Sequence, residues 1–372
     1  MTFYFLFVFG TYFLMMVVLR IGWEWGIRPK KTASAETNFF ISVVVAIRNE
    51  ESTVENLMTN LSGQNYPSSD FEVILVDDHS NDRSNHFVKT LSKDFSNFRI
   101  ISLNETEIGK KAALAKGIAL AKGKIIATTD ADCTLPSDWL KNINSEFYID
   151  KVKMVVGLVS ISSTKDFFSR LQAMEFASVM GTSVATINLG LPTMCNGANL
   201  SFWKQAFEEV NGYSGNENIA SGDDEFLMRK ILRRYPGSVH VLNDPSAMVV
   251  TQPLSFVSDF IHQRLRWASK WKYNSSFAPK ALAVFIFAVQ VSWIVFIISF
   301  FFGTSSLAIF VILVWLKIIA DLFFLVPVFR FLAIKFRLIP FVALQFLYPF
   351  YVVFISIFSP WKRNRWKGRP IT

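Results

Sequence analysis

The chain of 372 residues contains very little cysteine and histidine. Its two cysteines, Cys133 and Cys195, lie far apart and form no C-x-x-C pair. The sequence therefore offers neither a disulfide framework nor a zinc motif, and this cysteine usage suits a reducing cytosol. The four histidines are scattered and form no histidine-rich metal cluster.

Patterns that accompany nucleic-acid or dinucleotide binding are also missing. The net charge is +9, but the middle of the chain has no basic patch interleaved with aromatic residues. Five basic residues instead lie in the last twelve positions: Lys362, Arg363, Arg365, Lys367 and Arg369. This tail favours a membrane-surface anchor over a nucleic-acid footprint. No G-x-G-x-x-G follows the first apolar β-branched run, which disfavours a nucleotide-binding oxidoreductase.

Long apolar segments, in contrast, are abundant. The mean hydropathy of +0.33 and the 38 phenylalanines favour a membrane protein. Residues 3–19 carry no charge and are about long enough to span a bilayer. No basic residue precedes them and no small-residue cleavage site follows, which favours an anchor over a signal peptide. Three further segments of membrane length occur at 281–302, 305–328 and 338–358.

The charges that flank these segments predict an orientation. The first segment is followed by Arg20, Arg28, Lys30 and Lys31. The positive-inside rule then places the N-terminus outside and the next domain in the cytoplasm. Three later crossings would put the basic tail outside, although its charge favours the inside, and Pro349 is compatible with a kinked or re-entrant last segment. The side of the tail stays open. Lys317 and Asp321, four residues apart, are expected to neutralise each other inside the bundle.

The middle of the chain alternates apolar, β-branched runs with stretches of helical composition. The expected strands are 41–47, 71–76, 98–103, 124–129 and 154–159, and the expected helices between them are 51–63, 84–94 and 110–122. This alternation predicts an α/β fold with a mostly parallel sheet covered by helices.

Acidic residues follow three of the expected strands, at the sheet edge where ligands bind in open parallel sheets. The groups are Arg48-Asn49-Glu50, Asp77-Asp78 and Asp130-Ala131-Asp132. Such a cluster is electrostatically costly without a cation, and hard oxygen ligands suit Mg²⁺ or Mn²⁺. The pattern predicts a divalent metal that bridges carboxylates to a diphosphate.

Six motifs, in order, make the chain resemble the family-2 glycosyltransferases. They are Arg48-Asn49-Glu50, Asp77-Asp78, Gly109-Lys110-Lys111, Asp130-Ala131-Asp132, Asp223-Asp224 and Gln263-Arg264-Leu265-Arg266-Trp267. The resemblance covers about residues 40–270. It implies an α/β GT-A nucleotide-diphospho-sugar transferase fold. The apolar segments described above would flank this fold with one N-terminal and about three C-terminal transmembrane helices. The group with these motifs includes cellulose, chitin, hyaluronan and poly-N-acetylglucosamine synthases and ceramide glucosyltransferases.

The resemblance implies a donor site made by Arg48, Asn49, Glu50, Asp77, Asp78, Lys110, Lys111, Asp130, Gln263 and Arg266. The carboxylate of Asp77 can accept hydrogen bonds from a uracil or ribose edge, or simply cap the strand end. One of Lys110 and Lys111 is expected to meet phosphate, and the other is expected to be solvated. Asp132 resembles the direct metal ligand, and Asp130 resembles the residue that contacts ribose or metal-bound phosphate. The metal would neutralise charge on the departing diphosphate.

The same resemblance implies that Asp224 is the general base, which takes the proton of the acceptor hydroxyl. The family more often has Glu where this chain has Asp223, so the choice between the two neighbours stays open, and acids here also favour a helix N-terminus. One base and direct displacement would invert the sugar carbon. Asn196, in the Cys195-Asn196-Gly197-Ala198-Asn199 segment, resembles an acceptor-positioning residue, whereas Cys195 is expected to be a packed thiol.

Three residues of the Q-x-x-R-W motif, Gln263, Arg266 and Trp267, share one helix face. Arg266 can hold a diphosphate leaving group and Trp267 can stack on an acceptor sugar. The surrounding stretch, 254–271, is expected to lie along the membrane surface.

The expected organisation has five parts. It comprises an N-terminal transmembrane helix (1–22), a cytoplasmic GT-A catalytic domain (38–250), an interfacial helix (251–275), C-terminal transmembrane helices (281–358) and a basic tail (359–372). The expected location is a bacterial inner membrane, with several crossings.

Three functions compete. The first is an inverting transferase that moves sugar from a nucleotide-sugar, with UDP favoured, to a lipid or lipid-linked acceptor. The second is a processive polysaccharide synthase, for which about four membrane segments are few unless subunits or a partner help. The third, a catalytically dead membrane scaffold, is disfavoured by the intact Asp130, Asp132 and Asp224. A nucleic-acid partner is not expected, and the oligomeric state stays open.

Overall fold

A computed structural model describes residues 2–27, 38–162, 166–215, 222–270, 276–303, 305–361, 365–366 and 369–370. The chain divides into two compact units. Unit 1 comprises Met1–Arg28, Ser162–Thr193 and Pro253–Lys362, and unit 2 comprises Pro29–Ile161, Met194–Gln252 and Arg363–Thr372. Arg28, Lys30 and Lys31, on which the predicted orientation rests, lie outside the described residues, as does much of the basic tail.

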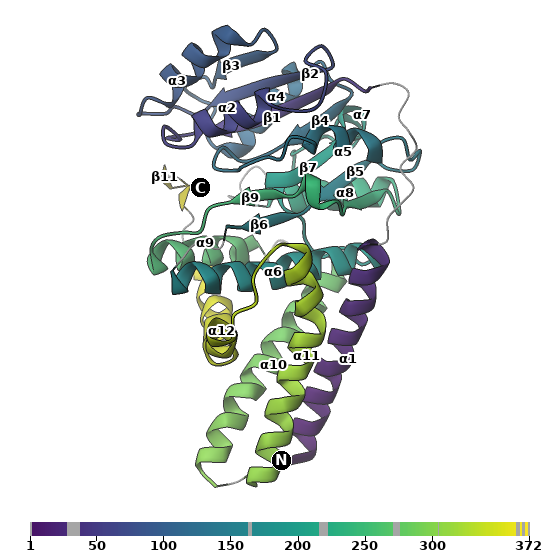
Figure 1. The fold of residues 1–372 in the computed structure, drawn as a ribbon, viewed down its shortest axis with the longest axis vertical. Helices are drawn as coiled ribbons and strands as arrows, with labels where there is room; N and C mark the ends of the chain where they lie inside the picture. Colours follow the sequence, from purple (N-terminus) through teal and green to yellow (C-terminus); the bar gives the residue numbers. More distant parts are fainter. Residues whose placement is uncertain are drawn as a thin grey trace. The chain divides into compact units, whose positions relative to one another are not determined.

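Unit 2 is built on a seven-stranded sheet of order β3-β2-β1-β4-β7-β5-β8 (Figure 1). The strands are β1 (Ile41–Ile47), β2 (Phe71–Asp77), β3 (Phe98–Ser102), β4 (Ile125–Thr128), β5 (Met154–Gly157), β7 (Leu200–Trp203) and β8 (Val239–Leu242). All neighbours are parallel except at β7, which runs antiparallel to β4 and β5. The predicted mostly parallel α/β fold is confirmed.

One expected strand, 154–159, is divided between two sheets. Its first part is β5, and the chain then enters β6 (Val159–Ile161), which pairs in parallel with β9 (Val249–Thr251) in a separate ladder. The break lies at Leu158, whose carbonyl accepts a hydrogen bond of 2.9 Å from the side chain of Asn199. A pattern of apolar residues could not predict this break, because both parts are buried.

The helices of unit 2 are α2 (Val54–Ser62), α3 (Ser84–Leu91), α4 (Lys110–Leu120), α5 (Trp139–Glu146), α7 (Lys204–Glu209) and α8 (Asp223–Arg234), with short turns η1 (Ser92–Asp94), η2 (Gly197–Asn199) and η3 (Pro245–Ala247). Helix α4 packs on β1 and β2. Gly117 permits this approach, since a Cβ there would lie 2.4 Å from Cγ1 of Val44. The basic tail forms a short antiparallel ladder of β10 (Arg365–Trp366) and β11 (Arg369–Pro370).

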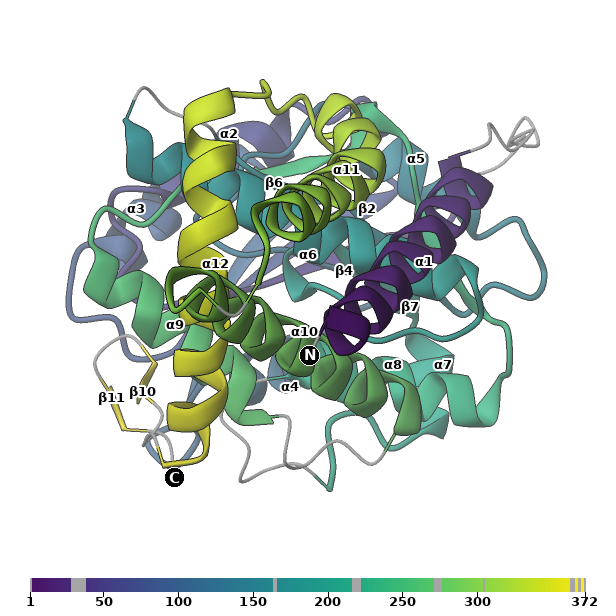
Figure 2. The ribbon, with the colours of Figure 1, turned by 90° about the horizontal axis from the view of Figure 1, so that it is seen from below.

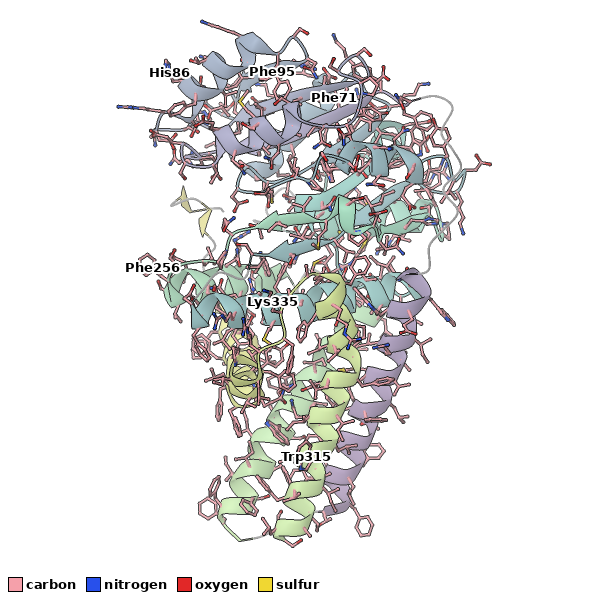
Figure 3. The ribbon with its side chains drawn as sticks, viewed as in Figure 1. Phe71, His86, Phe95, Phe256, Trp315 and Lys335 are labelled. Carbon is pink, nitrogen blue, oxygen red and sulfur yellow. The ribbon has the colours of Figure 1, made fainter. Side chains whose placement is uncertain are left out.

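Unit 1 contains the apolar helices. They are α1 (Thr2–Ile27), α10 (Phe277–Phe301), α11 (Leu307–Phe331) and α12 (Leu338–Phe358), together with α6 (Phe167–Asn188), α9 (Val257–Ser269) and the turn η5 (Ser359–Trp361). By length and composition, four of these helices could cross a membrane: α1, α10, α11 and α12. Large apolar side chains remain exposed on them, such as Trp315, which points outward from α11 (Figure 3). Surfaces of this kind suit contact with lipid.

The four apolar helices do not share one direction. Helices α1, α10 and α11 run side by side, whereas α12 is seen end-on in Figure 1 and along its length in Figure 2. Helix α12 therefore runs across the other three, and it packs against α6, α9 and α10. The predicted bounds of this segment agree with the helix, but apolar composition alone could not give its direction.

Helix α6 belongs to unit 1, although the sequence analysis placed its residues within the catalytic domain of 38–250. It packs against α1, α11 and α12. Gly181 permits close contact with α11, because a Cβ there would lie 2.8 Å from Cγ2 of Val328. The helix has no stretch that qualifies as a membrane span among the described residues, which is why hydropathy gave no signal for this association.

Inside unit 1 the pair Lys317–Asp321 is buried, with Nζ to Oδ2 at 2.9 Å, and the predicted neutralisation is confirmed. Lys317 also donates to Oε1 of Gln345 at 2.6 Å, which joins α11 to α12. The Tyr12 hydroxyl donates to Asp321 and so joins α1 to the same network. Buried charges thus have several partners, as charges in an apolar bundle require.

Candidate active site

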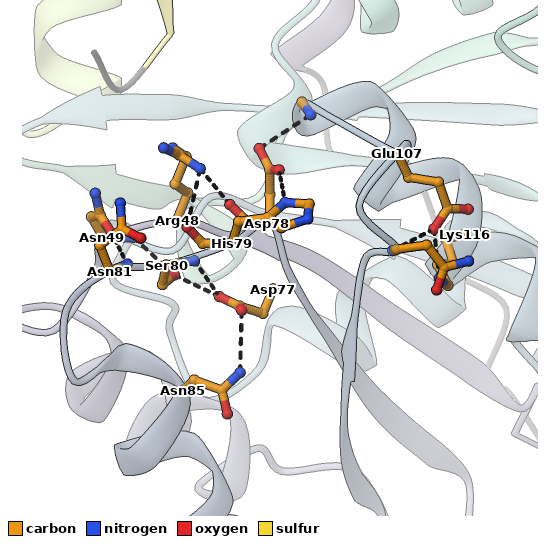
Figure 4. Close-up of polar contacts among 12 residues, drawn as sticks. Arg48, Asn49, Asp77, Asp78, His79, Ser80, Asn81, Asn85, Glu107 and Lys116 are labelled. Carbon is orange, nitrogen blue, oxygen red and sulfur yellow. Dashed lines mark hydrogen bonds and ion pairs between the residues drawn. The ribbon is translucent and has the colours of Figure 1, made fainter. Parts of the chain in front are cut away.

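The ends of β1 and β2 form a turn network that fixes the first two motifs (Figure 4). Arg48 donates from Nη1 to the carbonyl of Asp78 at 2.6 Å and to that of His79 at 3.2 Å. Asn49 and His79 have positive φ angles of 52° and 54°, which turn the chain sharply at both strand ends. The Asn49 side chain accepts from the amide of Asn81 at 2.8 Å.

The carboxylates of the second motif are used within this network. Asp77 Oδ1 accepts from the hydroxyl of Ser80 at 2.5 Å, and Oδ2 accepts from Asn85 at 3.1 Å (Figure 4). Asp78 is fully buried and accepts from the amide of Gly109 at 3.1 Å. These contacts shape the strand ends, as expected for capping residues. Contact of Arg48, Asp77 or Asp78 with a donor stays a prediction, and so does that of Glu50, which is buried.

The Asp78–Gly109 hydrogen bond fastens the start of α4 to the end of β2. Gly109 has φ of 98°, a conformation that favours glycine, and it precedes the helix directly. The loop before it is held by Glu107, which accepts from the amide of Asn104 at 2.9 Å and pairs with Lys116 of α4 at 2.6 Å (Figure 4). The lysines that open α4 therefore start from a fixed backbone.

These two lysines reach two different acidic motifs. Lys110 donates to Oδ1 of Asp130, which follows β4. The Nζ of Lys111 lies 3.3 Å from Oδ1 of Asp223, at the start of α8. The structure thus brings together three motifs that are far apart in sequence. Both lysines are engaged, whereas the sequence analysis expected one of them to be merely solvated.

The charges of these residues also shift the pKa values of Lys110 and Asp223. Burial lowers the pKa of Lys110, but the carboxylates of Asp130, Asp224 and Asp223 outweigh it and leave the pKa raised. The pKa of Asp223 is raised, chiefly by burial and further by Asp224, against the opposing effect of Lys111 and Lys110. Three carboxylates thus interact with the ammonium group of Lys110, at the carboxyl edge of the sheet.

Asp224 is held differently from its neighbour. Its Oδ2 accepts from the amide of Gly197 at 2.9 Å, and its Oδ1 accepts from the amide of Glu225 at 2.7 Å. Asn196 caps η2 through the amide of Ala198 at 3.0 Å. The predicted acceptor segment and the predicted base are therefore adjacent. Asp223 pairs with a lysine, whereas Asp224 accepts hydrogen bonds from two backbone amides, which favours Asp224 as a proton acceptor.

Two polar residues that the sequence analysis did not single out fix this segment. Thr128, the last residue of β4, donates to the carbonyl of Gly197 at 2.8 Å. Asn199 is buried, donates to the carbonyls of Leu158 and Ala247 and accepts from the indole of Trp139 at 2.9 Å. A polar side chain at the end of a buried apolar strand is the signal that could have identified Thr128.

The acidic residues after β4 suit a hard divalent cation in their chemistry. Asp130 and Asp132 offer carboxylate oxygens at one strand end, and the side chain of Asp132 is exposed. Within the described part of the chain, no group of three His, Cys, Asp or Glu side chains is arranged to hold a metal. Mg²⁺ is commonly held by one or two protein carboxylates together with phosphate and water oxygens, and Asp130 and Asp132 could supply such carboxylates.

The Q-x-x-R-W residues lie on α9, in unit 1. Gln263 accepts from Nη1 of Arg264. The guanidinium of Arg264 lies 4.3 Å from the ring centroid of Trp267. The contacts of Gln263 and Arg266 with a donor and of Trp267 with an acceptor stay predictions. Arg264 occupies one of the two unspecified positions of the motif, and the sequence alone gave it no functional role.

Comparison with known proteins identifies a matching family model and several relatives of this chain. The family model described as glycosyl transferase family 2 matches residues 42–210. A beta-monoglucosyldiacylglycerol synthase of Trichormus variabilis is 28% identical over 231 residues, which are 62% of this chain and 48% of that protein. A poly-beta-1,6-N-acetyl-D-glucosamine synthase of Staphylococcus epidermidis is 24% identical over 272 residues, 70% of this chain and 64% of that protein. The chain thus spans about half the length of the first of these relatives.

Among solved structures, the mannosyltransferase PcManGT from Pyrobaculum calidifontis, in complex with GDP-Man and Mn²⁺, is similar over 96% of each chain, with a TM-score of 0.62 and 18% sequence identity. At this identity the likeness concerns the fold. The matched family region contains the first four of the six motifs, from Arg48-Asn49-Glu50 to Asp130-Ala131-Asp132. Residues 42–210 therefore form a glycosyl transferase family 2 domain, and the chain has the GT-A fold.

Proposed function

We propose that the protein is a membrane-bound, inverting glycosyltransferase that moves a sugar from a nucleotide-sugar to a lipid or lipid-linked acceptor. The observation that carries the proposal is the convergence of Lys110, Lys111, Asp130, Asp223 and Asp224 at the carboxyl edge of the sheet. Cations that can meet a diphosphate lie beside a carboxylate that can take a proton. This is the arrangement that sugar transfer from a nucleoside diphosphate requires.

In the proposed reaction, the acceptor hydroxyl oxygen attacks the anomeric carbon of the donor sugar. The new glycosidic bond forms as the bond between that carbon and the phosphate oxygen breaks, and the nucleoside diphosphate leaves. The Asp224 carboxylate takes the hydroxyl proton, and the amides of Gly197 and Glu225 hold that carboxylate in place. A single displacement inverts the anomeric carbon.

We assign the donor's diphosphate to Lys110 and Lys111, with Arg266 as a further ligand of the leaving group. Asp132, with Asp130, would hold a divalent ion, Mg²⁺ or Mn²⁺, which when bound supplies Lewis-acid stabilisation of the diphosphate. Lys110 then has to leave Asp130 or share it. Arg48, Asn49, Glu50, Asp77 and Gln263 remain proposed donor contacts, with uridine as the favoured base.

Lipid is favoured as acceptor because of the relatives and the membrane helices. One relative is named for glucosyldiacylglycerol synthesis and another for polymer synthesis. Four candidate membrane helices are few for a channel that encloses a growing polymer, which favours single transfer. The processive synthase remains the second candidate, supported by the relative named for a poly-N-acetylglucosamine product.

We further propose that α1, α10 and α11 cross the membrane and that α12 lies along its surface. An N-terminus outside and three crossings bring the chain to the cytoplasmic side at the end of α11. The basic tail then lies on the cytoplasmic side, where its charge is favoured. A cytoplasmic tail resolves the conflict that four crossings would create. Labelling of single cysteines placed at Thr2 and Trp366 from each side of sealed vesicles would test this topology.

The test of function uses membranes that contain the protein, supplied with labelled nucleotide-sugars and Mn²⁺. Membranes with Asp224→Asn serve as the matched control. We expect label to enter the organic phase in the wild type alone. Label in a large water-soluble product would instead establish the polymerase, and equal labelling in both membranes would refute the proposed catalysis.

A further inference from the structure

A buried cluster in unit 1 surrounds the Q-x-x-R-W helix, and we call Glu175, Arg264 and Tyr351 the Arg264 bracket. Arg264 of α9 forms a two-point ion pair with Glu175 of α6, with Nη2 to Oε2 at 2.6 Å and Nε to Oε1 at 3.2 Å. Tyr351 of α12 donates to the same Oε1 at 3.2 Å. The bracket therefore joins α9 to two other helices.

The ion pair of the bracket is almost completely buried. Only 4% of the Arg264 side chain and 6% of the Glu175 side chain are exposed. A buried ion pair of this kind contributes little net stability compared with well-packed apolar residues, because both charges lose their hydration. Its fixed fork geometry, by contrast, restricts how the partner helices can be placed.

The guanidinium of Arg264 also packs between two aromatic rings of its own helix. It lies 4.5 Å from the ring centroid of Phe260 and 4.3 Å from that of Trp267. On α6, Phe176 follows Glu175 directly, and its ring centroid lies 6.1 Å from that of Trp267. Phe260 lies 5.7 Å from Tyr351, centroid to centroid. Arg264 thus links the ion pair to the indole.

We infer that Glu175 and Arg264 are positioning residues, which fix the orientation of the Trp267 indole for the acceptor. The inference rests on the proposed function, in which Trp267 stacks on the acceptor sugar. Neither Glu175 nor Arg264 needs to touch substrate. Arg264 covers one side of the indole, and Glu175 and Tyr351 hold Arg264, so the ring keeps one orientation while the side chain stays partly exposed.

The test compares Glu175→Gln and Arg264→Lys with the wild type in purified full-length protein. Glu175→Gln keeps the shape and removes the charge, and Arg264→Lys keeps the charge and removes the planar fork. We expect the acceptor KM to rise by roughly ten- to a hundredfold through misplacement of the indole, with donor hydrolysis changed by less than about twofold. Asp259→Asn, an exposed acid on the same helix, is the matched control and should leave both unchanged.

A double-mutant cycle with Trp267→Ala separates positioning from a general structural role. If Glu175 acts through the indole, Glu175→Gln should change the acceptor KM by no more than about twofold once Trp267 is absent. Additive effects, or equal losses in acceptor use and donor hydrolysis, would overturn the inference. If Glu175→Gln fails to fold, Tyr351→Phe, which removes one hydrogen bond, takes its place in the cycle.

A spectroscopic readout keeps the inference separate from the proposed function. In protein labelled with 5-fluorotryptophan, the ¹⁹F resonance of position 267 is assigned from Trp267→Phe. We expect this resonance to shift in Glu175→Gln and Arg264→Lys and to stay in place in Asp259→Asn. An unmoved resonance would refute the positioning role even in an active enzyme. Absence of any sugar transfer by the wild type would refute the proposed function, while the resonance would still decide the role of the bracket.

Discussion

The amide of Gly197 donates a hydrogen bond of 2.9 Å to Oδ2 of Asp224, so the turn η2, directly before β7, holds a carboxylate of helix α8. Thr128, at the end of β4, donates to the carbonyl of the same glycine at 2.8 Å. The sheet edge and the proposed base are therefore linked through one residue. The link explains how Asp224 keeps its orientation although it lies at a helix terminus.

Asp224→Asn should abolish sugar transfer while nucleotide-sugar binding persists. Asparagine keeps the shape and can still accept the Gly197 amide, but it cannot take a proton, so we expect a fall of about a hundredfold or more in kcat. Transfer of labelled sugar and calorimetric donor binding measure the two effects. Loss of donor binding with residual transfer would contradict the assignment, and Asp223→Asn serves as the comparison between the neighbours.

Asp132→Asn should remove the metal dependence of turnover. The carboxylate is the proposed direct ligand, and loss of Lewis-acid stabilisation worth several kcal/mol lowers the rate by roughly a hundredfold or more. Titration with Mn²⁺, followed by its paramagnetic resonance in the presence of nucleoside diphosphate, should show weaker binding. Near-normal activity and Mn²⁺ affinity in the variant would exclude Asp132 as the ligand.

Gly117→Ala should weaken donor binding by displacing helix α4. The added Cβ would lie 2.4 Å from Val44 and 3.1 Å from Val76, so α4 has to move away from β1 and β2. We expect a loss of about 1–3 kcal/mol in unfolding free energy and a raised donor KM, because Lys110 and Lys111 begin this helix. Gly10→Ala, in α1, is the control, since its Cβ would meet no atom within 4 Å. Equal behaviour of the two variants would refute the packing argument.

The raised pKa of Asp223 makes a prediction about stability and pH. A carboxyl group with a raised pKa in the folded state binds its proton more tightly there than in the unfolded chain. Its contribution to stability therefore increases as pH falls through the folded pKa, and it is complete below the unfolded value of 3.8. Thermal unfolding of the wild type and Asp223→Asn between pH 7 and pH 4 should show the difference in Tm shifting in favour of the wild type at the acidic end. A constant difference would show that Asp223 has an ordinary pKa.

Lys317→Met should destabilise the helix bundle more than the double change Lys317→Met with Asp321→Asn. The single variant leaves a buried carboxylate without its ammonium partner, at a cost of about 3 kcal/mol, and the double variant removes both charges. The midpoint of heat-induced aggregation in detergent compares them with the wild type. A double variant that is less stable than the single one would refute the argument, because removal of the unpaired Asp321 charge should restore stability.

The order of strands and helices around the site could be predicted largely from sequence. The run 41–47 agrees with β1 residue for residue, and the helix expected at 110–122 begins at Lys110, as α4 does. Alternating composition suffices here, because every element of a parallel sheet with covering helices must bury an apolar face. The pairing of Lys111 with Asp223 could not be predicted, since composition does not indicate which side chains of distant segments meet.

The sequence by itself determined the family motifs, the α/β alternation and the presence of four apolar segments, because these depend on local composition and on residue order. Only the tertiary structure decided that α12 runs across α1, α10 and α11, that α6 packs with the apolar helices and that Gly197 holds Asp224. Helix direction and side-chain pairing depend on contacts between segments far apart in the chain. Arg264 is the clearest case: its position in the motif is unspecified, yet Glu175 and Tyr351, on two other helices, fix its place.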